Sequence, residues 1–235
     1  MKNYIEGDIH EVIKTLDEDT IDFIYTDPPF GTTKAEWDKG LDWETLFPEM
    51  WRVLKPNGII CLYASIPFTY ELLRYETPKY HYSWKKNNST AFMLAKKQPL
   101  RTIEEIFIYY KKPGTYNPQM VGNTEYKMDM VGSYGGQNYY GKNHKDRSTM
   151  KKEDIYSKDK GHKGRYPTTD KDWKVRRDGS GITRTDEQID YFIKTYSNED
   201  DTILDMTCHT NYVGDRAEVL NRNYIGVDLN LCITD

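Results

Sequence analysis

Apolar runs that end directly in an aspartate are the feature of this sequence that most restricts its fold. The runs and their terminal acids are 21–26 with Asp27, 202–204 with Asp205, and 224–227 with Asp228. Stretches with helical spacing, among them residues 9–16 and 186–196, alternate with strand-like runs. This alternation predicts a doubly wound α/β sheet that is parallel or mostly parallel. Ligands of such sheets lie at the carboxyl ends of the strands, so we expect the three acids at the ligand edge.

The rest of the chain extends this pattern, with one long interruption. The remaining expected elements are strands at 2–6, 59–64, 80–85 and 105–110 and helices at 41–55 and 67–76. From 112 to 181 the periodicity is lost, and a span of about 70 residues is too long for a structureless loop in a compact domain. We therefore expect a main α/β domain formed by residues 1–111 and 182–235, with an inserted lobe at 112–181.

The charge of the chain is distributed unevenly. The formal net charge is −4, with 33 Lys and Arg against 37 Asp and Glu, yet Lys111–Gly179 holds 16 basic residues against 9 acidic ones. A basic segment on an acidic body favours a nucleic-acid partner, and the inserted lobe is the expected contact. A solvated surface loop is the other interpretation of such a Lys- and Gly-rich stretch.

Cysteine spacing and hydropathy set limits on cofactors and location. Cys61, Cys208 and Cys232 lie far apart, and no spacing typical of a zinc site or a disulfide framework occurs, so we expect reduced thiols and no metal. No apolar run approaches the roughly 18 residues that a membrane span needs, and no signal peptide precedes the first strand. We expect a cytoplasmic protein with no membrane partner.

The tetrapeptide Asp27-Pro28-Pro29-Phe30, directly after an apolar strand, is the strongest functional signal. The Asp27 carboxylate can accept one proton of an exocyclic amine, and the Pro28 carbonyl can accept the other because Pro29 holds that backbone extended. Two acceptors turn the amine lone pair toward an electrophile, while Phe30 offers a face for a flat base. A simple strand-ending turn is the alternative, and a base in duplex DNA would first have to be flipped out.

Three stretches of the chain together resemble DNA adenine-N6 amino-methyltransferases of phage and bacterial type, namely residues 7–58, 83–120 and 194–230. The resemblance is to the permuted class, in which the DPPF motif precedes the cofactor-binding motif. It implies a Rossmann-like sheet, S-adenosylmethionine as methyl donor, and transfer to the N6 amine of a flipped adenine in double-stranded DNA. It also implies the cytoplasm of a bacterial or phage-infected cell. Asp27, where cytosine-N4 enzymes commonly have serine, favours adenine.

The resemblance assigns cofactor-binding residues by matching position. Asp8 would hold the adenine amine of the cofactor, Asp228 the ribose hydroxyls, and Asp205 would begin the cofactor loop. The full expected set is Asp8, Ile9, Asp205, Thr207, Cys208, His209, Asn211, Asp228 and Leu229.

The cofactor loop departs from the family pattern, which reads approximately D-P-F-x-G-S-G-T-T-G. His209 and Asn211 replace the two inner glycines, and Gly214 remains. Asn tolerates a left-handed backbone better than most residues, so we expect Asn211 to preserve the turn, with His209 placing an imidazole where the family has a hydrogen. The family's H-P-T-x-K-P motif is also lost, since residues 180–188 keep only a threonine and the basic Arg184.

Two functional interpretations follow from these departures. In the first, the enzyme is active and His209 and Asn211 contact the methionine carboxylate of the cofactor with their side chains. In the second, cofactor binding is lost, which leaves a DNA-binding pseudoenzyme or a subunit that depends on a partner. The intact tetrapeptide, Asp8 and Asp228 favour the first. Cytosine-N4 or RNA methyl transfer is a further alternative, and both a homodimer and a heteromeric partner are compatible with the sequence.

Candidate DNA contacts fall in three parts of the chain. Lys34 and Trp37 follow the tetrapeptide and would close over the flipped base, unless they form a surface loop with one packed tryptophan. The other phosphate- or base-contacting candidates are Lys97 and Arg101 near strand ends, and Arg165, Tyr166, Arg176 and Arg177 in the lobe. Trp173 is a further candidate for stacking on a base.

Overall fold

A computed structural model of the protein describes residues 1–90, 92–126, 162–178 and 181–233. The chain forms two compact units, one of Met1–Asn117 with Thr168–Asp235 and one of Pro118–Pro167. The expected lobe, residues 112–181, includes the second unit and extends beyond it at both ends. Its role as a recognition lobe stays a prediction.

The first unit is built on one large sheet in the order β1-β12-β11-β2-β3-β5-β4-β8. Its strands are β1 (Lys2–Glu6), β2 (Ile21–Thr26), β3 (Leu54–Ala64), β4 (Tyr80–Thr90), β5 (Arg101–Tyr109), β8 (Asp170–Lys171), β11 (Thr202–Asp205) and β12 (Asn223–Asp228). The five strands from β1 to β3 run parallel, whereas β5 pairs antiparallel with both β3 and β4. The expected Rossmann-like, mostly parallel sheet is confirmed.

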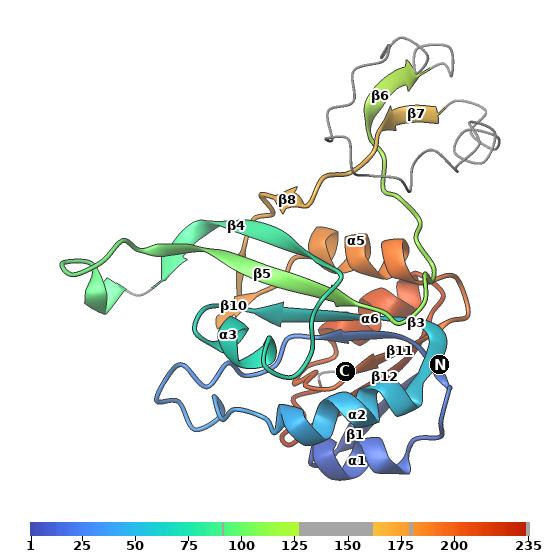
Figure 1. Cartoon of the computed structure of the whole chain (residues 1–235), viewed down its shortest axis with the longest axis horizontal. Coiled ribbons are helices and arrows are strands. Elements are labelled where there is room, and N and C mark those ends of the chain that lie inside the picture. The colour runs from blue at the N-terminus through green and yellow to red at the C-terminus, as the bar shows by residue number, and fades with distance from the viewer. Residues whose placement is uncertain (91, 127–161, 179–180, 234–235) are drawn as a thin grey trace, which may run out of the picture. The chain divides into compact units, whose positions relative to one another are not determined.

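Helices cover both faces of this sheet (Figure 1). They are α1 (Ile9–Thr15), α2 (Trp43–Val53), α3 (Phe68–Leu72), α5 (Asp186–Tyr196) and α6 (Tyr212–Val219). Side chains alternate across a strand, and in β3 Ile60 and Leu62 join the core under α1 and α2, while Cys61 and Tyr63 join the core under α5 and α6. Because both faces are buried, the central strands are almost uniformly apolar in sequence.

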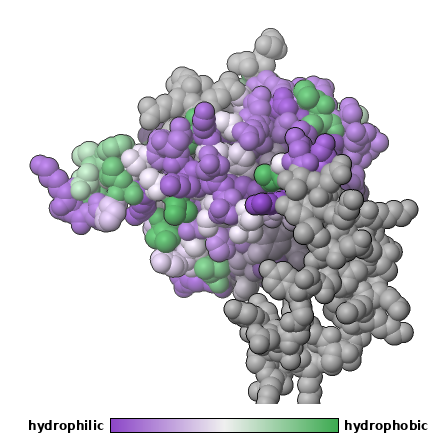
Figure 2. Space-filling model, turned by 90° about the horizontal axis from the view of Figure 1, so that it is seen from above, coloured by the Kyte–Doolittle hydropathy of each residue, from purple (hydrophilic) through white to green (hydrophobic). Residues whose placement is uncertain are grey.

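Strands β4 and β5 are longer than expected and form a hairpin that projects from the sheet, with the 3-10 turn η1 (Phe92–Leu94) at its end. Hydrophobic surface lies at this end beside hydrophilic surface (Figure 2), where Phe92 and Met93 are exposed. The sequence between Lys85 and Ile103 has five Lys and Arg and no acid. The outer halves of these strands lack an apolar pattern, because a buried Lys86–Glu104 pair replaces it.

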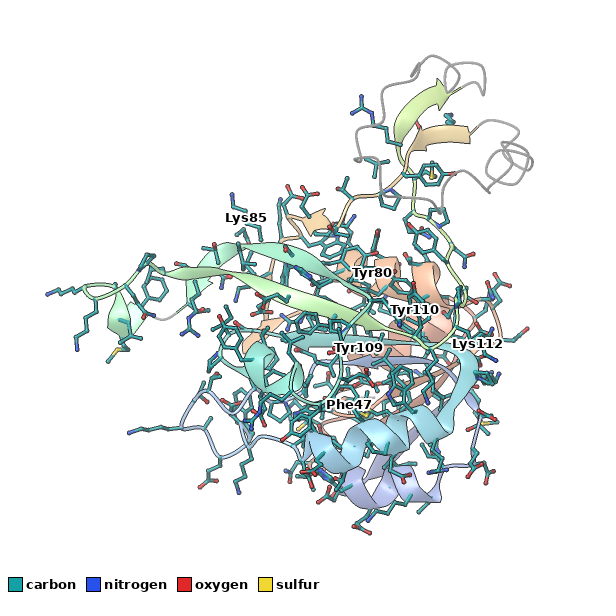
Figure 3. The ribbon with its side chains drawn as sticks, viewed as in Figure 1. Phe47, Tyr80, Lys85, Tyr109, Tyr110 and Lys112 are labelled. Carbon is teal, nitrogen blue, oxygen red and sulfur yellow. The ribbon has the colours of Figure 1, made fainter. Side chains whose placement is uncertain are left out.

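Three of the side chains labelled in Figure 3 show how residues lie relative to the sheet. Phe47 of α2 packs edge-to-face on Tyr109 of β5, with ring centroids 5.5 Å apart, between helix and sheet. Lys85 on β4 is exposed to solvent. The expected helix at 67–76 is the shorter α3, which ends at Leu72.

Two small strand pairs complete the described structure. In the first unit, β9 (Arg176–Asp178) pairs with β10 (Gly181–Thr183). In the second unit, β6 (Val121–Tyr126) pairs with β7 (His162–Arg165). Within the described ranges, none of the helices has the length and apolar character that crossing a membrane requires.

The carboxyl ends of β1, β12, β11 and β2 meet at one edge of the sheet. Glu6 of β1 is in register with Asp228, and the backbone N–H of Gly7 donates to the Asp228 carbonyl at 2.9 Å. Asp205 is in register with Gly226 of β12, and β11 pairs with β2 on its other side. This edge therefore gathers the acids that the sequence analysis placed at strand ends.

Candidate active site at the carboxyl edge of the sheet

The tetrapeptide leaves β2 at Asp27 and turns toward α3. Pro28 is buried, and the ring of Phe30 stacks on Phe68, with centroids 5.3 Å apart and planes 18° from parallel. Phe68 packs in turn on Trp43 of α2. Phe30 is thereby held in one orientation by the core under the helices, and it remains only partly buried.

The carboxylate of Asp27 is oriented by an arginine. The Arg184 guanidinium donates from Nη2 to Asp27 Oδ1 at 2.7 Å, and the Asp27 side chain keeps 37% of its surface exposed. Within the described part of the chain, Oδ2 of Asp27 has no hydrogen-bond donor. Burial raises the pKa of Asp27, and the positive charge of Arg184 opposes that rise. One oxygen is thus held in place and the other stays open for an incoming donor.

Arg184 is itself enclosed. Its side chain is 11% exposed, and its guanidinium carbon lies 4.4 Å from the ring centre of Tyr63 and 4.7 Å from that of Trp84. A second guanidinium nitrogen, Nη1, lies 3.0 Å from Glu104 Oε2, and Glu104 Oε1 accepts from Lys86 Nζ at 2.6 Å. The sequence analysis noted Arg184 only as the remnant of a motif and missed Glu104 and Lys86.

The segment after the tetrapeptide is closed by Asp38. Its carboxylate accepts the backbone N–H groups of Gly31, Thr32 and Thr33 at 2.8, 2.9 and 2.6 Å. Burial works against ionisation of Asp38, but these bonds outweigh it and lower the pKa. Beside it Trp37 is 74% exposed, so the alternative of a packed tryptophan is wrong. Lys34 is exposed as well.

Asp8 ends the β1 segment as the N-cap of α1. Its Oδ1 accepts from the His10 backbone N–H at 2.9 Å and lies 2.8 Å from His10 Nδ1, and the backbone bond with His10 lowers the pKa of Asp8. The Asp42 backbone N–H donates to His10 Nε2, which leaves the proton of a neutral imidazole on Nδ1 facing Asp8. The side chain of the adjacent Ile9 belongs to the core.

Asp228 organises the cofactor loop through backbone groups. Its Oδ2 accepts from the His209 N–H and its Oδ1 from the Asn230 N–H, both at 2.9 Å. Leu229, between them, is exposed. The loop that follows β11 is therefore tied to the end of β12 by the acid expected to face the cofactor ribose.

The left-handed residue of this loop is His209, not Asn211. His209 has φ +50°, whereas Asn211 has φ −72° as the N-cap of α6, so the expectation that Asn211 preserves the turn is wrong. The position that must donate its N–H to Asp228 is the one that needs the unusual backbone angle. The His209 ring points its Nδ1 at the Asn230 carbonyl, 3.2 Å away, and the Asn211 side chain donates to Asp215.

Asp205 is buried, and among the described residues no cation lies beside it. It accepts from the Thr207 N–H and the Tyr224 hydroxyl, each at 3.2 Å, and it makes no ion pair with any described residue. Burial raises its pKa to about 7, and the negative charges of Asp27 and Asp228 add to the rise. Asp205 is therefore poised to release its proton when a positive charge arrives.

Two further loop residues connect the strands. The hydroxyl of Thr207 lies 3.1 Å from that of Thr26 in β2, which joins the loop to the strand before Asp27. Cys208 is buried, and a Cβ placed on Gly226 would lie 2.9 Å from its sulfur, so the thiol packs where β12 has a glycine. Burial raises the pKa of Cys208 and keeps it a neutral thiol.

The DNA-contact candidates have different environments. Lys97 and Arg101 are exposed on the β4–β5 hairpin, where the Arg101 guanidinium also donates to the Ile66 carbonyl at 2.6 Å. Arg165 and Tyr166 are exposed at the end of the second unit. Arg176 and Arg177 lie on β9, and their side chains fall outside the description.

Trp173 is a core residue, and its assignment as a base-stacking side chain is wrong. It is 7% exposed and packs on Tyr191 and Phe192 of α5, with ring centroids 5.1 and 5.4 Å away. Its carbonyl accepts from Trp84 Nε1 at 2.7 Å. Since the lobe sequence returns to the body here, this tryptophan anchors the return. In the described part of the chain, no group of three or more His, Cys, Asp or Glu side chains forms a metal-binding cluster.

The doubly wound sheet and its row of strand-end carboxylates place this protein among Rossmann-like α/β proteins of the methyltransferase type. The family model for DNA methylases of the N6/N4 type matches residues 21–234, and the chain belongs to that family. The predicted family of DNA amino-methyltransferases is thereby confirmed, and the permuted class and adenine specificity stay predictions.

Curated relatives and solved structures agree with this assignment. The chain is 26% identical to type II methyltransferase M.BamHI of Bacillus amyloliquefaciens, over 96% of this chain and 54% of that protein. It is 24% identical to M.HpaI of Haemophilus parainfluenzae, over 94% of this chain and 68% of that protein. The chain thus spans about half to two thirds of the length of these relatives.

Two solved structures show the same fold at low identity. The complex of M1.HpyAVI with S-adenosylmethionine matches with a TM-score of 0.59 and 17% identity, over 97% of this chain and 94% of that one. The cytosine-N4-specific PvuII DNA methyltransferase matches with a TM-score of 0.62 and 13% identity, over 97% and 82%.

Proposed function

We propose that the protein transfers a methyl group from S-adenosylmethionine to the N6 amine of adenine in double-stranded DNA. One observation carries this proposal: Asp27 directly follows β2, three residues before the stacked Phe30, with one carboxylate oxygen held by Arg184 and the other open. The family of DNA methylases supplies the reaction class, and the geometry supplies an acceptor ready for an exocyclic amine.

The described residues orient the target base. Oδ2 of Asp27 accepts one amine proton and the Pro28 carbonyl accepts the other, so that the nitrogen lone pair points at the methyl group. Phe30, fixed from behind by Phe68, stacks on the base. No covalent intermediate with the protein is required, and most of the rate gain comes from positioning.

The cofactor edge suits a cationic ligand. Asp205 is a desolvated carboxyl without a described cation, and S-adenosylmethionine carries an ammonium and a sulfonium group. Asp8, Asp228 and the backbone around His209 provide hydrogen-bonding groups for its adenosine part at the same edge. When bound, the cofactor supplies an electrophilic methyl group; the protein residues hold it and exclude other orientations.

DNA contact would come from the catalytic edge outward. Exposed Lys34 and Trp37 lie after the tetrapeptide, and the β4–β5 hairpin adds Lys97, Arg101 and a surplus of positive charge. Phosphates bind such groups without sequence preference. Further proposed contacts are Arg165, Tyr166, Arg176 and Arg177. The enzyme would act on DNA in the cytoplasm of a bacterial or phage-infected cell.

Cytosine N4 is the second candidate acceptor, because the PvuII enzyme of that specificity shares the fold. Two kinds of duplex are prepared, in which one strand carries either adenine or cytosine as its only base with an exocyclic amine. Each duplex is incubated with labelled S-adenosylmethionine. Digestion and mass spectrometry then identify N6-methyladenine or N4-methylcytosine. We expect the adenine product; the cytosine product would overturn the adenine assignment. In a parallel reaction with RNA, label transferred to the RNA and not to DNA would overturn the DNA assignment.

Calorimetric titration with S-adenosylmethionine, with and without duplex, separates an active enzyme from a pseudoenzyme. We expect micromolar binding by the free protein. DNA binding without any cofactor binding or methyl transfer would favour the pseudoenzyme, whereas recovery on adding a partner would favour a heteromeric subunit. Sedimentation of the protein with duplex in the same buffer distinguishes a homodimer from a monomer.

A further inference from the structure

Asp27 stands at the exposed end of a row of four alternating charges, of which the other three are largely buried. The row runs Asp27, Arg184, Glu104, Lys86, with contacts of 2.7, 3.0 and 2.6 Å. The side chains of Arg184 and Glu104 are each 11% exposed and that of Lys86 is 4% exposed. The row joins three segments: the end of β2, the β4–β5 hairpin, and the chain that enters α5.

Such a row is not explained by stability. Charges removed from water lose hydration, and apolar residues of similar size often replace a buried ion pair at no loss of stability. Positions 86 and 104 lie on paired strands of a sheet that elsewhere fills its interior with apolar and aromatic side chains. Charges kept here therefore call for a function, and the one member of the row that reaches the ligand edge is Asp27.

We propose that Arg184 is a positioning residue for Asp27, and that Glu104 and Lys86 hold Arg184 in its working orientation. The inference rests on the proposed methyl transfer but concerns residues that this function does not yet employ. Two aromatic rings fix the plane of the guanidinium, which binds Oδ1 of Asp27 and leaves Oδ2 for the amine. Arg suits the task because its planar, delocalised cation lies against two carboxylates at once, with a hydrogen bond to Asp27 and an ion pair with Glu104.

Charge as well as geometry is at stake. A protonated Asp27 would lose acceptor strength toward an amine, and burial favours that protonated form, while Arg184 favours the ionised one. The groups around Asp27 that titrate or carry charge are Tyr25 on β2, Cys61 and Tyr63 on β3, Lys86 on β4, Glu104 on β5, Asp205 on β11, and Arg184. Burial raises the pKa of both tyrosines and of Cys61, so these stay neutral.

Glu104 is held ionised from both sides. Burial opposes its charge, yet the adjacent Arg184 and Lys86 outweigh burial and lower its pKa. An ionised Glu104 attracts the second arm of Arg184 and prevents the guanidinium from turning wholly toward Asp27. Loss of Glu104 would therefore disturb Asp27 at one remove, and by less than loss of Arg184.

The test compares Arg184→Met, Arg184→Lys and Glu104→Gln with Arg216→Met, which removes a partly buried arginine paired with Asp190 away from the tetrapeptide. We expect Arg184→Met to lower kcat by about 100-fold, the loss that follows misplacement of a catalytic group. KM for S-adenosylmethionine should change less than twofold, and the acid limb of the pH profile of kcat should move to higher pH. Arg184→Lys should recover part of the loss, Glu104→Gln should lose less, and Arg216→Met should keep the wild-type pH profile.

Asp205 titrates near neutrality, so each pH profile is repeated in an Asp205→Asn background. A shift of the acid limb that persists in this background belongs to Asp27. A wild-type limb in Arg184→Met, or an equal shift in Arg216→Met, would overturn the inference.

A measurement without catalysis keeps the inference separate from the proposed function. The protein is labelled with carbon-13 at its aspartate carboxyl groups and titrated by NMR. The Asp27 signal is assigned as the one that disappears in Asp27→Asn. We expect that signal to titrate at higher pH in Arg184→Met than in the wild type, and in between in Arg184→Lys, which also serves if the methionine variant fails to fold. Shifted titration in a protein with no methyl transfer would remove the proposed function and keep the coupling; unshifted titration would overturn the coupling whatever the activity.

Discussion

The proposed catalytic segment (residues 27–38) follows β2, and the cofactor loop (residues 205–211) follows the neighbouring parallel strand β11. The first carboxylates of these two segments have opposite electrostatic surroundings. Asp27 has an arginine on one oxygen, whereas Asp205 is buried beside two other acids and has no described cation. The first carboxylate is oriented before any ligand arrives. The second has no charge partner among the described residues. Under the proposed function, this difference matches two different ligands, a neutral base at Asp27 and a cation at Asp205.

Replacing Asp27 by Asn should lower the rate of methyl transfer more than replacing Asp205, Asp38 or His209. The amide presents a donor toward the amine or toward Arg184, so we expect methyl transfer to fall by about 1,000-fold, on the scale of losing one well-placed group in an active site. Binding of S-adenosylmethionine, measured by calorimetry, should stay within about threefold of the wild type. Retained activity would remove Asp27 from the mechanism.

Replacing Asp205 by Asn should sharpen the contrast through the pH dependence of stability. The folded pKa of Asp205 is about 7 against about 3.9 in an unfolded chain, so the unfolded chain releases this proton first and stability falls as pH rises from about 4 to about 7. The variant lacks this fall, and its free energy of unfolding should gain on the wild type by about 2 to 4 kcal/mol between pH 4 and pH 8.

Urea unfolding of both proteins across that range measures the gain, and comparing the two ends removes any pH-independent effect of the substitution. Parallel stability curves would contradict the raised pKa. Calorimetry at pH 8 should also show weaker cofactor binding by the variant, because the amide cannot neutralise a cation.

Replacing Asp38 by Asn should loosen the catalytic segment while leaving the cofactor loop unchanged. One amide oxygen cannot serve the three N–H groups that the carboxylate accepts, and hydrogen bonds to a charged group contribute about 1.5–3 kcal/mol. We expect faster amide exchange at residues 31–33 and unchanged exchange at residues 207–210. Equal changes in both regions would point to general destabilisation.

Replacing His209 tests the cofactor loop with the smallest effect. Glycine relieves a left-handed backbone and should stabilise the fold by about 1 kcal/mol, whereas alanine keeps the backbone demand and removes only the imidazole. If the ring is a cofactor ligand, both variants weaken binding of S-adenosylmethionine; if it obstructs, both strengthen it. Opposite effects of the two variants on affinity would assign the role to the backbone.

The strand-end acids and the tetrapeptide are predictable from sequence because they follow local rules. A buried parallel strand must be apolar, and the residue after it meets the ligand edge, so Asp27, Asp205 and Asp228 could be placed by periodicity alone. The contact between Asp27 and Arg184 spans 157 positions and depends on how the chain returns to α5, which no local pattern encodes.

Other parts escaped prediction because polar side chains were buried or a core residue lay in a polar stretch. Because Lys86 and Glu104 form a buried ion pair, the outer halves of β4 and β5 lack the apolar pattern by which a strand is recognised. The two adjacent lysines in an otherwise alternating strand were the available sign that one of them is buried. Trp173 lies in a Lys- and Gly-rich sequence and was interpreted as a surface aromatic, although it anchors the body core. The left-handed angle at 209 was assigned to Asn211 by residue preference, whereas the hydrogen bond to Asp228 decides it.

The left-handed backbone at His209 has a consequence for which residues this position can accept. The loop needs an N–H at this position and an angle that admits it, and the acceptor is an acid on another strand. The position therefore accepts a residue larger than glycine at a modest loss of stability, because the hydrogen bond comes from the backbone and not from the side chain. The connection between this loop and β12 is specified by the Asp228 carboxylate and by the backbone angle at 209, and it does not require a glycine there.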